Sequence, residues 1–366
     1  MKILFLTNIP SPYRVNFFNE LGKLCELTVV FECQSSTERD DSWKKFEASH
    51  FSAVFLRGIR KGVANAFCPG IIKYLSGDLY DHIVVTNFTS PTGMLAILWM
   101  RLQGIPYWLE SDGGFAKCGR GLKERLKKYF IKDASGYFST AQEHDRYYIQ
   151  YGADPERIHR YPFTSLYRKD ILNEPISFEQ KTSIRKELGI VEPNVILAVG
   201  QFIHRKGFDV LLNAMSVLPK NIGCYIVGGI PTEEYCELVE KYRLDNVHFV
   251  GFQSEKELKA YYRAADLMVH PTREDIWGLV VNEAMATGLP VVTTDRCIAG
   301  LELIMERGEG VIVSAEDAVG LREAIKCVLH ETNEDSSKRI LRKMENYCFE
   351  KMAERHIDIL KNRGVL

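Results

Sequence analysis

Residues 267–292, LMVHPTREDIWGLVVNEAMATGLPVV, carry the pattern that decides the fold. The segment opens on an apolar run, 267–270, and closes on the start of another, 291–294; such runs are typical of strands buried on both faces of a parallel sheet. Between them we expect a polar loop and a helix that begins near Gly278 and ends at Gly288, since a glycine followed by Pro290 is a usual helix stop. Strand, helix and parallel strand form a βαβ unit, which predicts an α/β fold.

The same alternation of apolar runs and amphipathic stretches extends over the whole chain. Before residue 165 we expect strands at 2–7, 26–31, 53–56, 82–86, 106–110 and 136–140. A polar break at 168–188 is followed by expected strands at 195–200, 224–228, 248–251, 267–270, 291–294 and 311–313. We therefore predict two Rossmann-like doubly wound domains, 1–165 and 166–345, and a helix in 346–366 that caps the second domain or crosses back to the first. Ligands of such sheets bind at the carboxyl ends of the strands, and two domains would place the site in a cleft between them.

The bulk composition narrows the classes of partner. The 366 residues carry a formal net charge of −1, which argues against a nucleic-acid binder. Residues 1–170 hold 23 Lys and Arg against 18 Asp and Glu, so the basic first half points to an anionic partner or surface, or to chance asymmetry. Nine cysteines, an odd number without C-x-x-C spacing, are typical of reduced thiols in a cytosolic protein. The N-terminal run predicts a first strand rather than a signal peptide, and no apolar run is long enough to span a membrane.

The loop and helix that start near Gly278 offer chemistry for a phosphorylated ligand. Free backbone N–H groups at a helix start suit phosphate, and a glycine lets a ligand approach the backbone closely. Glu283 stands among apolar residues, where a carboxylate is costly unless it is hydrogen-bonded, and a ribose diol offers two donors. Asp275, eight residues earlier, could reach a sugar. The alternative is that Glu283 pairs with a Lys or Arg and that Asp275 or Glu274 caps the helix.

This segment resembles the acidic-x7-acidic motif of retaining glycosyltransferases of the GT-B fold, in the group 1 or family-four class. That motif normally has Glu at both ends, then Ala-Met-Ala, Gly and Pro-Val-Val, whereas the first acid here is the shorter Asp275, with Glu274 as a competing candidate. The resemblance implies that Glu283 binds the ribose and Asp275 the donor sugar. It also implies that Trp277, Gly278, Leu279 and Val280 contact the donor and that the backbone of 278–280 binds the pyrophosphate.

A second motif lies at residues 199–207, VGQFIHRKG. The family usually has Gly-Arg-Leu here and Lys-Gly a few residues on, and its cations neutralise the diphosphate leaving group. Lys206 matches, Gln201 stands where the Arg is expected, and Arg205 could supply the missing charge; the alternative is a solvated basic turn. The resemblance also implies nucleotide-lining turns, which adds as donor-binding residues Gly200, Gln201, Gly228, Phe252 and Gln253.

The first domain matches the family in plan more than in motif. Tyr13 and Arg14 follow the first strand, and Glu110 and Asp112 follow the fifth; these four could contact the acceptor or the sugar, or serve as structural loop and capping residues. From Lys117 to Lys132 there are seven basic residues and one acid. As a basic amphipathic helix, this stretch could rest on an anionic membrane face, which would suit a lipid-linked acceptor, or it could pack its apolar side on the sheet.

The resemblance implies an enzyme that moves a sugar, as a hexosyltransferase does, from a nucleotide diphosphate donor to a saccharide or lipid-linked saccharide. The expected donor is a UDP-sugar, by family frequency, and the expected setting is cell-surface polysaccharide synthesis in the cytoplasm or at the inner membrane face. Attack on the same face of the sugar, assisted by the leaving phosphate, requires no dedicated nucleophile. No metal-site motif occurs, so we expect metal independence and no cofactor. The alternatives are a nucleotide-sugar epimerase and a non-catalytic GT-B partner; a Rossmann dehydrogenase is disfavoured because G-x-G-x-x-G is missing.

Overall fold

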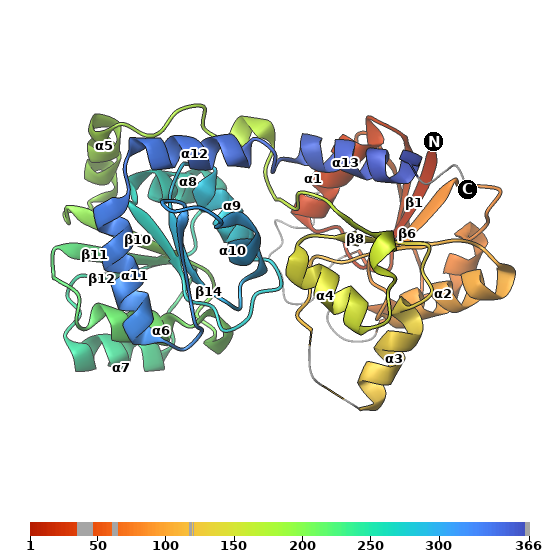
Figure 1. Ribbon diagram of the computed structural model, residues 1–366, viewed down its shortest axis with the longest axis horizontal. Helices are drawn as coiled ribbons and strands as arrows, with labels where there is room; N and C mark the ends of the chain where they lie inside the picture. Colours follow the sequence, from red (N-terminus) through yellow and green to blue (C-terminus); the bar gives the residue numbers. More distant parts are fainter. Residues whose placement is uncertain (35–46, 61–64, 117–118, 120, 363–366) are drawn as a thin grey trace. The chain divides into compact units, whose positions relative to one another are not determined.

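The computed structural model describes residues 1–34, 47–60, 65–116, 119 and 121–362. The chain forms two compact units, residues 1–164 with 348–366, and residues 165–347. Each unit contains a parallel sheet with helices packed on it (Figure 1). The predicted α/β class with two parallel sheets is therefore confirmed. Of the basic stretch from Lys117 to Lys132, residues 117, 118 and 120 lie outside the described part.

The first unit is built on a seven-stranded sheet in the order β3-β2-β1-β6-β7-β8-β9. Its strands are β1 (Lys2–Thr7), β2 (Glu26–Phe31), β3 (Ser52–Phe55), β6 (His82–Val85), β7 (Trp108–Glu110), β8 (Gly136–Ser139) and β9 (Ile158–Arg160). A separate two-stranded pair joins β4 (Ile59–Arg60) and β5 (Ala66–Phe67). The helices are α1 (Pro12–Gly22), α2 (Pro91–Gln103), α3 (Leu122–Ile131), α4 (Gln142–Gln150) and α13 (Phe349–Asn362), with 3-10 turns η2 (Pro69–Tyr74) and η3 (Pro155–Arg157).

The second unit is built on a six-stranded sheet in the order β12-β11-β10-β13-β14-β15. Its strands are β10 (Asn194–Val199), β11 (Ile222–Val227), β12 (Val247–Val250), β13 (Leu267–His270), β14 (Val291–Thr294) and β15 (Gly310–Val313). Its helices are α5 (Phe178–Leu188), α6 (Phe208–Met215), α7 (Glu233–Tyr242), α8 (Glu255–Ala264), α9 (Leu279–Met285), α10 (Ile298–Leu303), α11 (Ala318–Glu331) and α12 (Glu334–Met344), with 3-10 turns η4 (Arg168–Asp170) and η5 (His204–Lys206).

The central strands are apolar because both of their faces are covered. In β10, Ile196 and Ala198 are fully buried in the main core, together with Ile226 of β11 and Val269 of β13. The order of the sheet reverses between β10 and β13, because β11 and β12 lie on one side of β10 whereas β13, β14 and β15 lie on the other. The loops that leave these two strands therefore open side by side, which is where doubly wound sheets bind ligands.

Among the elements that were not expected from the sequence are the edge strand β9 and the helix α5. The edge strand β9, Ile158–Arg160, has a basic end and no apolar run, so the pattern of buried strands misses it. The polar stretch 168–188 was expected to be a break, but it contains α5. Local signals for that helix were present: Ser177 and Gln180 form a capping box, and Gly189 ends the helix in the left-handed region with φ 69°.

The C-terminal helix α13 packs against α1 in the first unit. It buries one apolar face, which includes Met352, Ile357 and Leu360. None of the helices in the described part of the chain is long and apolar enough to cross a membrane. The eight cysteines within the described ranges are all free thiols.

Two glycines with the same backbone conformation give a test of the close approach between the loops after β10 and β13. Gly207 and Gly189 have φ 70° and 69°, but a Cβ on Gly207 would lie 2.0 Å from the carbonyl oxygen of Pro271, whereas Gly189 has open space. We expect Gly189→Ala to lower the free energy of unfolding by about 1–2 kcal/mol through backbone strain alone. Gly207→Ala should cost about 1–3 kcal/mol more, because the loops must separate. Urea unfolding of both variants measures the difference, and equal losses would contradict the tight contact.

Candidate functional site

The loops after β10 and β13 are hydrogen-bonded to each other at the carboxyl edge of the second sheet. Arg205 of η5 accepts, through its backbone oxygen, the backbone N–H of Arg273 at 2.8 Å and the hydroxyl of Thr272 at 3.0 Å. The Arg273 guanidinium binds Asp209 at the start of α6 through two hydrogen bonds of 2.6 and 2.8 Å. These bonds fix the positions of the two candidate cations, Arg205 and Lys206, relative to the loop that carries Asp275.

The carboxylate of Asp275 is the centre of this edge. Its Oδ2 accepts from Lys206 Nζ at 2.7 Å and lies 3.2 Å from His270 Nε2, while Arg205 is 3.6 Å from Oδ1. Only 9% of Asp275 is exposed. Burial by itself would raise the pKa of Asp275, but the hydrogen bond with His270 and the charge of Lys206 hold it well below its usual range. Asp275 is therefore an ionised carboxylate beside two cations.

Glu274, the competing candidate for the first acid, is directed elsewhere. Its carboxylate accepts from the guanidinium of Arg296 at 2.9 Å. Its backbone oxygen accepts from Arg205 at 2.9 Å. Asp275, and not Glu274, is therefore the acid that pairs with Lys206.

Glu283 lies partly buried on α9 and has a different environment. Its Oε2 accepts a hydrogen bond of 2.9 Å from the hydroxyl of Tyr262. Within the described ranges Glu283 forms no ion pair, so the predicted alternative, a salt bridge to a Lys or Arg, is not observed there. The nearby Lys259 pairs with Asp170 and Glu255. Burial raises the pKa of Glu283 to about 7. Within the described residues, Glu283 has no ion pair like that of Asp275 with Lys206, which would offset the cost of burying its charge.

Gly278 is the N-cap of α9 and adopts φ 102°. A Cβ there would lie 2.9 Å from Cys297 Sγ, so glycine is required both by conformation and by space. The next two residues, Leu279 and Val280, begin the helix, where backbone N–H groups lack an intrahelical partner. Trp277 is only 2% exposed, and its indole N–H donates to Asn282 at 2.7 Å. This places the Trp277 ring beneath the loop as support, not on the surface where a donor would bind.

The remaining predicted donor residues lie in turns after β10, β11 and β12. A Cβ on Gly228 would lie 1.9 Å from the backbone oxygen of Gly200, so the first two turns touch through their glycines. Gln201 is exposed, and the amide of Gln253 donates to the backbone oxygens of residues 251 and 252. Phe252 is 82% exposed, which is unusual for an aromatic ring and leaves its face open for stacking.

In the first unit, the four predicted residues form one hydrogen-bonded network at the ends of β1 and β7. The guanidinium of Arg14 pairs with both Glu110 and Asp112, and Tyr13 donates its hydroxyl to Asp112. Glu110 is fully buried and also lies within hydrogen-bond distance of Tyr161 and His356, each at 3.3 Å. Burial opposes ionisation, but the charge of Arg14 and the hydrogen bond with His356 lower the pKa of Glu110 to about 2.

The four predicted residues of this network differ in their exposure to solvent. Glu110 and Arg14, with 0% and 4% exposure, are turned inward and hold the loop in place, so the structure does not present them to an acceptor. Tyr13 and Asp112 are partly exposed at the same edge. The sequence did not indicate His356 of α13 as part of this network, because it lies 246 residues from Glu110.

The first unit also contains a Ser–His pair, but the tautomer of its histidine cannot accept a proton from the serine. Ser111 Oγ lies 2.9 Å from His144 Nε2, but His144 Nδ1 accepts the backbone N–H of Thr140 at 3.2 Å. The ring proton of neutral His144 is therefore on Nε2, and that nitrogen donates to the serine instead of accepting its proton. Burial lowers the pKa of His144 to about 3, which keeps the ring neutral. The pair is structural.

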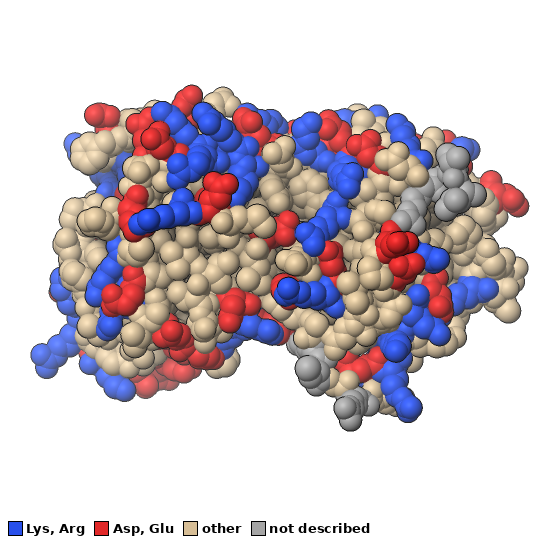
Figure 2. Space-filling view, in the orientation of Figure 1, with Lys and Arg blue, Asp and Glu red and all other residues tan. Residues whose placement is uncertain are grey.

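The described part of the basic stretch forms α3, most of whose apolar side chains keep exposed surface. Leu122, Leu126 and Tyr129 are 81%, 43% and 47% exposed, and only Phe130 and Ile131 are buried. Figure 2 shows Lys and Arg side chains over this helix, and among them Lys123 and Lys128 are exposed. The alternative in which this stretch packs its apolar side on the sheet therefore holds for Phe130, whereas Leu122, Leu126 and Tyr129 keep exposed surface.

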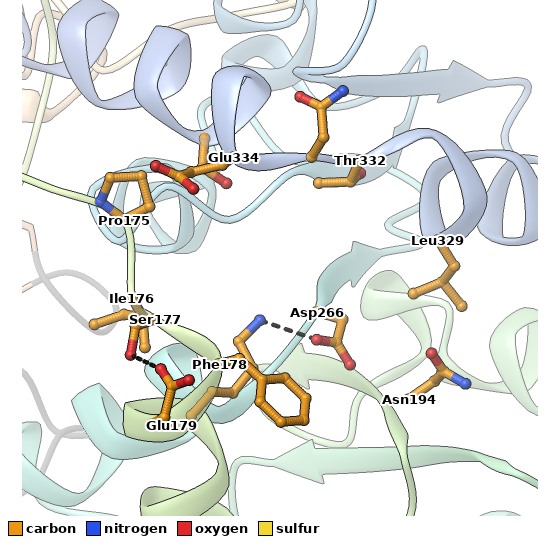
Figure 3. A pocket seen from close by; sticks show the side chains of 13 residues that line it. Pro175, Ile176, Ser177, Phe178, Glu179, Asn194, Asp266, Leu329, Thr332 and Glu334 are labelled. Carbon is orange, nitrogen blue, oxygen red and sulfur yellow. Dashed lines mark hydrogen bonds and ion pairs between the residues drawn. The ribbon is translucent and has the colours of Figure 1, made fainter.

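A hollow of about 570 Å³ lies at the opposite, amino-terminal edge of the second sheet (Figure 3). It is bordered by the start of α5, by Asp266 before β13 and by the end of α11. Asp266 accepts from Lys181 at 2.9 Å and from Arg185 at 2.6 Å, so its charge is already neutralised. None of the predicted donor residues lines this hollow.

Comparison with known proteins gives a family match for residues 180–346 and a fold match for the whole chain. Residues 180–346 match the family model described as "Glycosyl transferases group 1". Over almost its whole length, the chain has a structure similar to that of HepE of Anabaena in complex with UDP, with a TM-score of 0.80. The two chains are 16% identical in sequence, and the match covers 99% of this chain and 100% of the other. The resemblance inferred from the sequence is therefore confirmed: residues 180–346 carry the group 1 glycosyltransferase domain, and the chain has the GT-B fold.

Two curated relatives match over shorter stretches. Over 171 residues the chain is 32% identical to an uncharacterized 41.2 kDa protein in the cps region of Klebsiella pneumoniae, which covers 46% of each chain. Over 156 residues it is 31% identical to the lipopolysaccharide glucosyltransferase WaaG of Escherichia coli, which covers 40% of each chain. The match thus spans less than half the length of these relatives.

The raised pKa of Glu283 predicts how the stability of the fold depends on pH. The pKa rises from 4.5 to about 7 on folding, so the folded state retains the proton longer and ionisation disfavours folding as the pH increases through this window. We expect Glu283→Gln to unfold with about 1–3 kcal/mol more free energy than wild type at pH 8, and with no difference near pH 4.5. Urea unfolding from pH 4.5 to pH 8 tests this. The exposed Glu237→Gln on α7 is the control, and a pH-independent effect of Glu283→Gln would contradict the assignment.

Proposed function

We propose that this protein is a retaining glycosyltransferase that moves a hexosyl group from a UDP-sugar to a saccharide or lipid-linked saccharide. The observation that carries the proposal is the carboxylate of Glu283, which is partly buried and hydrogen-bonded but has no cation partner within the described residues. Such a group is costly unless a ligand completes its hydrogen bonds, and a ribose diol supplies two donors.

The other residues of this edge have matching roles in the proposal. Lys206 and Arg205 would neutralise the diphosphate, with the N–H groups of Leu279 and Val280 as further donors. Asp275 would accept a hydroxyl of the donor sugar, and the open face of Phe252 would stack on the base. Because two side-chain cations supply the charge that the leaving group needs, we propose a reaction that requires no metal ion.

The reaction step balances without a protein nucleophile. The bond between the anomeric carbon and the diphosphate oxygen breaks, and UDP leaves with both electrons of that bond. The acceptor oxygen forms the new bond on the same face, and its proton passes to the departing phosphate oxygen. Tyr13 and Asp112 remain our proposed contacts for the acceptor, with Arg14 and Glu110 holding them in position.

The comparisons support the choice of donor and setting. HepE has been solved with UDP and with UDP-glucose, WaaG is named a lipopolysaccharide glucosyltransferase, and the Klebsiella protein is named for a cps region. We therefore propose UDP-glucose as the first donor to test and cell-surface polysaccharide synthesis as the process. We further propose that the protein acts in the cytoplasm, at the inner face of the membrane, through α3.

Donor binding provides the first test. We expect one of UDP-, GDP- and ADP-glucose to raise the melting temperature by several degrees, since a ligand at a hundred times its Kd stabilises by about 2.7 kcal/mol. The shift should be lost in Glu283→Ala and retained in Glu237→Ala, an exposed glutamate on α7. No shift with any nucleotide sugar, or an unchanged shift in Glu283→Ala, would overturn the site. Release of UDP together with transfer to an acceptor would distinguish a transferase from an epimerase.

Membrane contact gives a separate test. We expect the full chain to float with vesicles of phosphatidylcholine and phosphatidylglycerol, more weakly at high salt, because the exposed basic residues of α3 lie beside exposed apolar side chains. Each basic residue near an anionic surface contributes about 1 kcal/mol, so Lys123→Glu with Lys128→Glu should weaken binding about tenfold or more. Lys186→Glu with Lys256→Glu makes the same charge change in the second unit and should have little effect. Equal losses in both double variants would contradict a role for α3.

A further inference from the structure

His270 is a buried polar residue at the centre of the proposed donor edge that no motif assigns. It is the last residue of β13 and has no exposed surface. Its backbone oxygen accepts from the hydroxyl of Thr293 at 2.8 Å, which fixes the end of the strand. The ring lies with Nε2 3.2 Å from Asp275 Oδ2, and within the described residues the buried Nδ1 has no hydrogen-bond partner.

The direction of the bond between His270 and Asp275 follows from the charges. Asp275 is ionised and can only accept, so His270 must donate through Nε2. A neutral ring then carries its one proton on Nε2 and leaves Nδ1 with a bare lone pair in a buried place. A buried polar atom without a partner costs free energy, and native structures contain few of them. The hydrogen bond from Nε2 to Asp275 is therefore the polar contact that this buried ring makes through its nitrogens within the described residues.

Asp275 Oδ2 is shared between His270 and Lys206, and the two donors differ in mobility. Lys206 reaches the oxygen with a long flexible chain, whereas His270 is held inside the sheet. A diphosphate at this edge would compete for the ammonium group of Lys206. Asp275 would then lose its main cation and, as a buried carboxylate, would need another donor to stay ionised and in place.

We propose that His270 is a positioning residue that holds Asp275 Oδ2 while Lys206 turns to the diphosphate, so that Oδ1 stays directed at a hydroxyl of the donor sugar. This inference rests on the proposed function, because it needs a diphosphate-sugar ligand. The backbone supports it: Asp275 N–H donates to Arg296 at 2.8 Å and Ile298 N–H donates to the oxygen of Asp275 at 3.2 Å. With the main chain pinned and a single carbon before the carboxylate, a bond to Oδ2 also orients Oδ1.

The same geometry predicts proton uptake on nucleotide binding. The groups that face the ring are Asp275, Lys206, Arg205 and the thiol of Cys297, and burial keeps that thiol neutral by raising its pKa to about 12. Burial lowers the pKa of His270, and the charges of Lys206 and Arg205 lower it further, while Asp275 raises it. When Lys206 moves toward phosphate, part of the lowering is removed, so the pKa of His270 should rise.

The test compares UDP with UDP-glucose on the full chain by calorimetric titration. His270→Leu removes the donor to Oδ2, whereas the side-chain amide of His270→Gln can restore it. We expect the ratio of UDP-glucose to UDP affinity to fall about tenfold in His270→Leu and to stay within about threefold of wild type in His270→Gln, since a hydrogen bond to a charged group is worth roughly that factor. His144→Leu, another buried histidine outside this edge, should leave the ratio unchanged.

The outcomes separate this inference from the proposed function. If wild type binds neither ligand, the proposed function fails and the inference fails with it. If wild type binds both and His270→Leu lowers both affinities equally or neither, only the positioning role of His270 is overturned. Should His270→Leu not fold, nitrogen NMR of wild type decides: we expect a protonated Nε2 and a bare Nδ1 in the free protein, with a higher pKa in the presence of UDP. A proton on Nδ1 in the free protein would overturn the inference.

Discussion

The ion pair between Lys206 and Asp275 is the interaction on which the carboxyl edge of the second unit's sheet depends. It joins the loops that leave β10 and β13, the two strands between which the order of the sheet reverses. A buried carboxylate can remain charged only with close donors, and here the donors come from the neighbouring loop and from the end of the strand itself. Folding of the sheet therefore brings a negative charge and its cations together before any ligand is present.

Eight residues later, the pKa of Glu283 is shifted in the opposite direction. Glu283 is also a partly buried carboxylate, but a tyrosine hydroxyl takes the place of a cation, and burial raises its pKa instead of lowering it. The folded protein thus supplies cations and a histidine to the carboxylate of Asp275, whereas within the described residues it supplies no cation to that of Glu283. Two carboxylates whose environments separate their pKa values are typical of functional sites.

The first unit uses the same kind of sheet for a different purpose at its carboxyl edge. There the charges of Arg14, Glu110 and Asp112 are saturated by each other, and His356 of α13 is drawn into the same network. Such a network makes the loop rigid, and it ties the C-terminal helix to the strand end that carries Glu110. Of the four predicted residues at this edge, Tyr13 and Asp112 are the two that keep surface toward solvent.

Much of this could be predicted from the sequence, because apolar runs and glycine stops are local signals of buried strands and helix ends. The residues 267–292 determined a strand, a loop, a helix beginning at Gly278 and a spacing of eight between Asp275 and Glu283. A short edge strand such as β9 and a polar helix such as α5 lack an apolar run and were missed. Only the tertiary structure decided which polar groups meet: that Asp275 pairs with Lys206 and His270, that Glu274 turns to Arg296, that Trp277 is buried and that Glu110 faces inward. The physical reason is that hydrogen bonds and burial join residues far apart in the chain, and no local pattern records which of several nearby charges a carboxylate will contact.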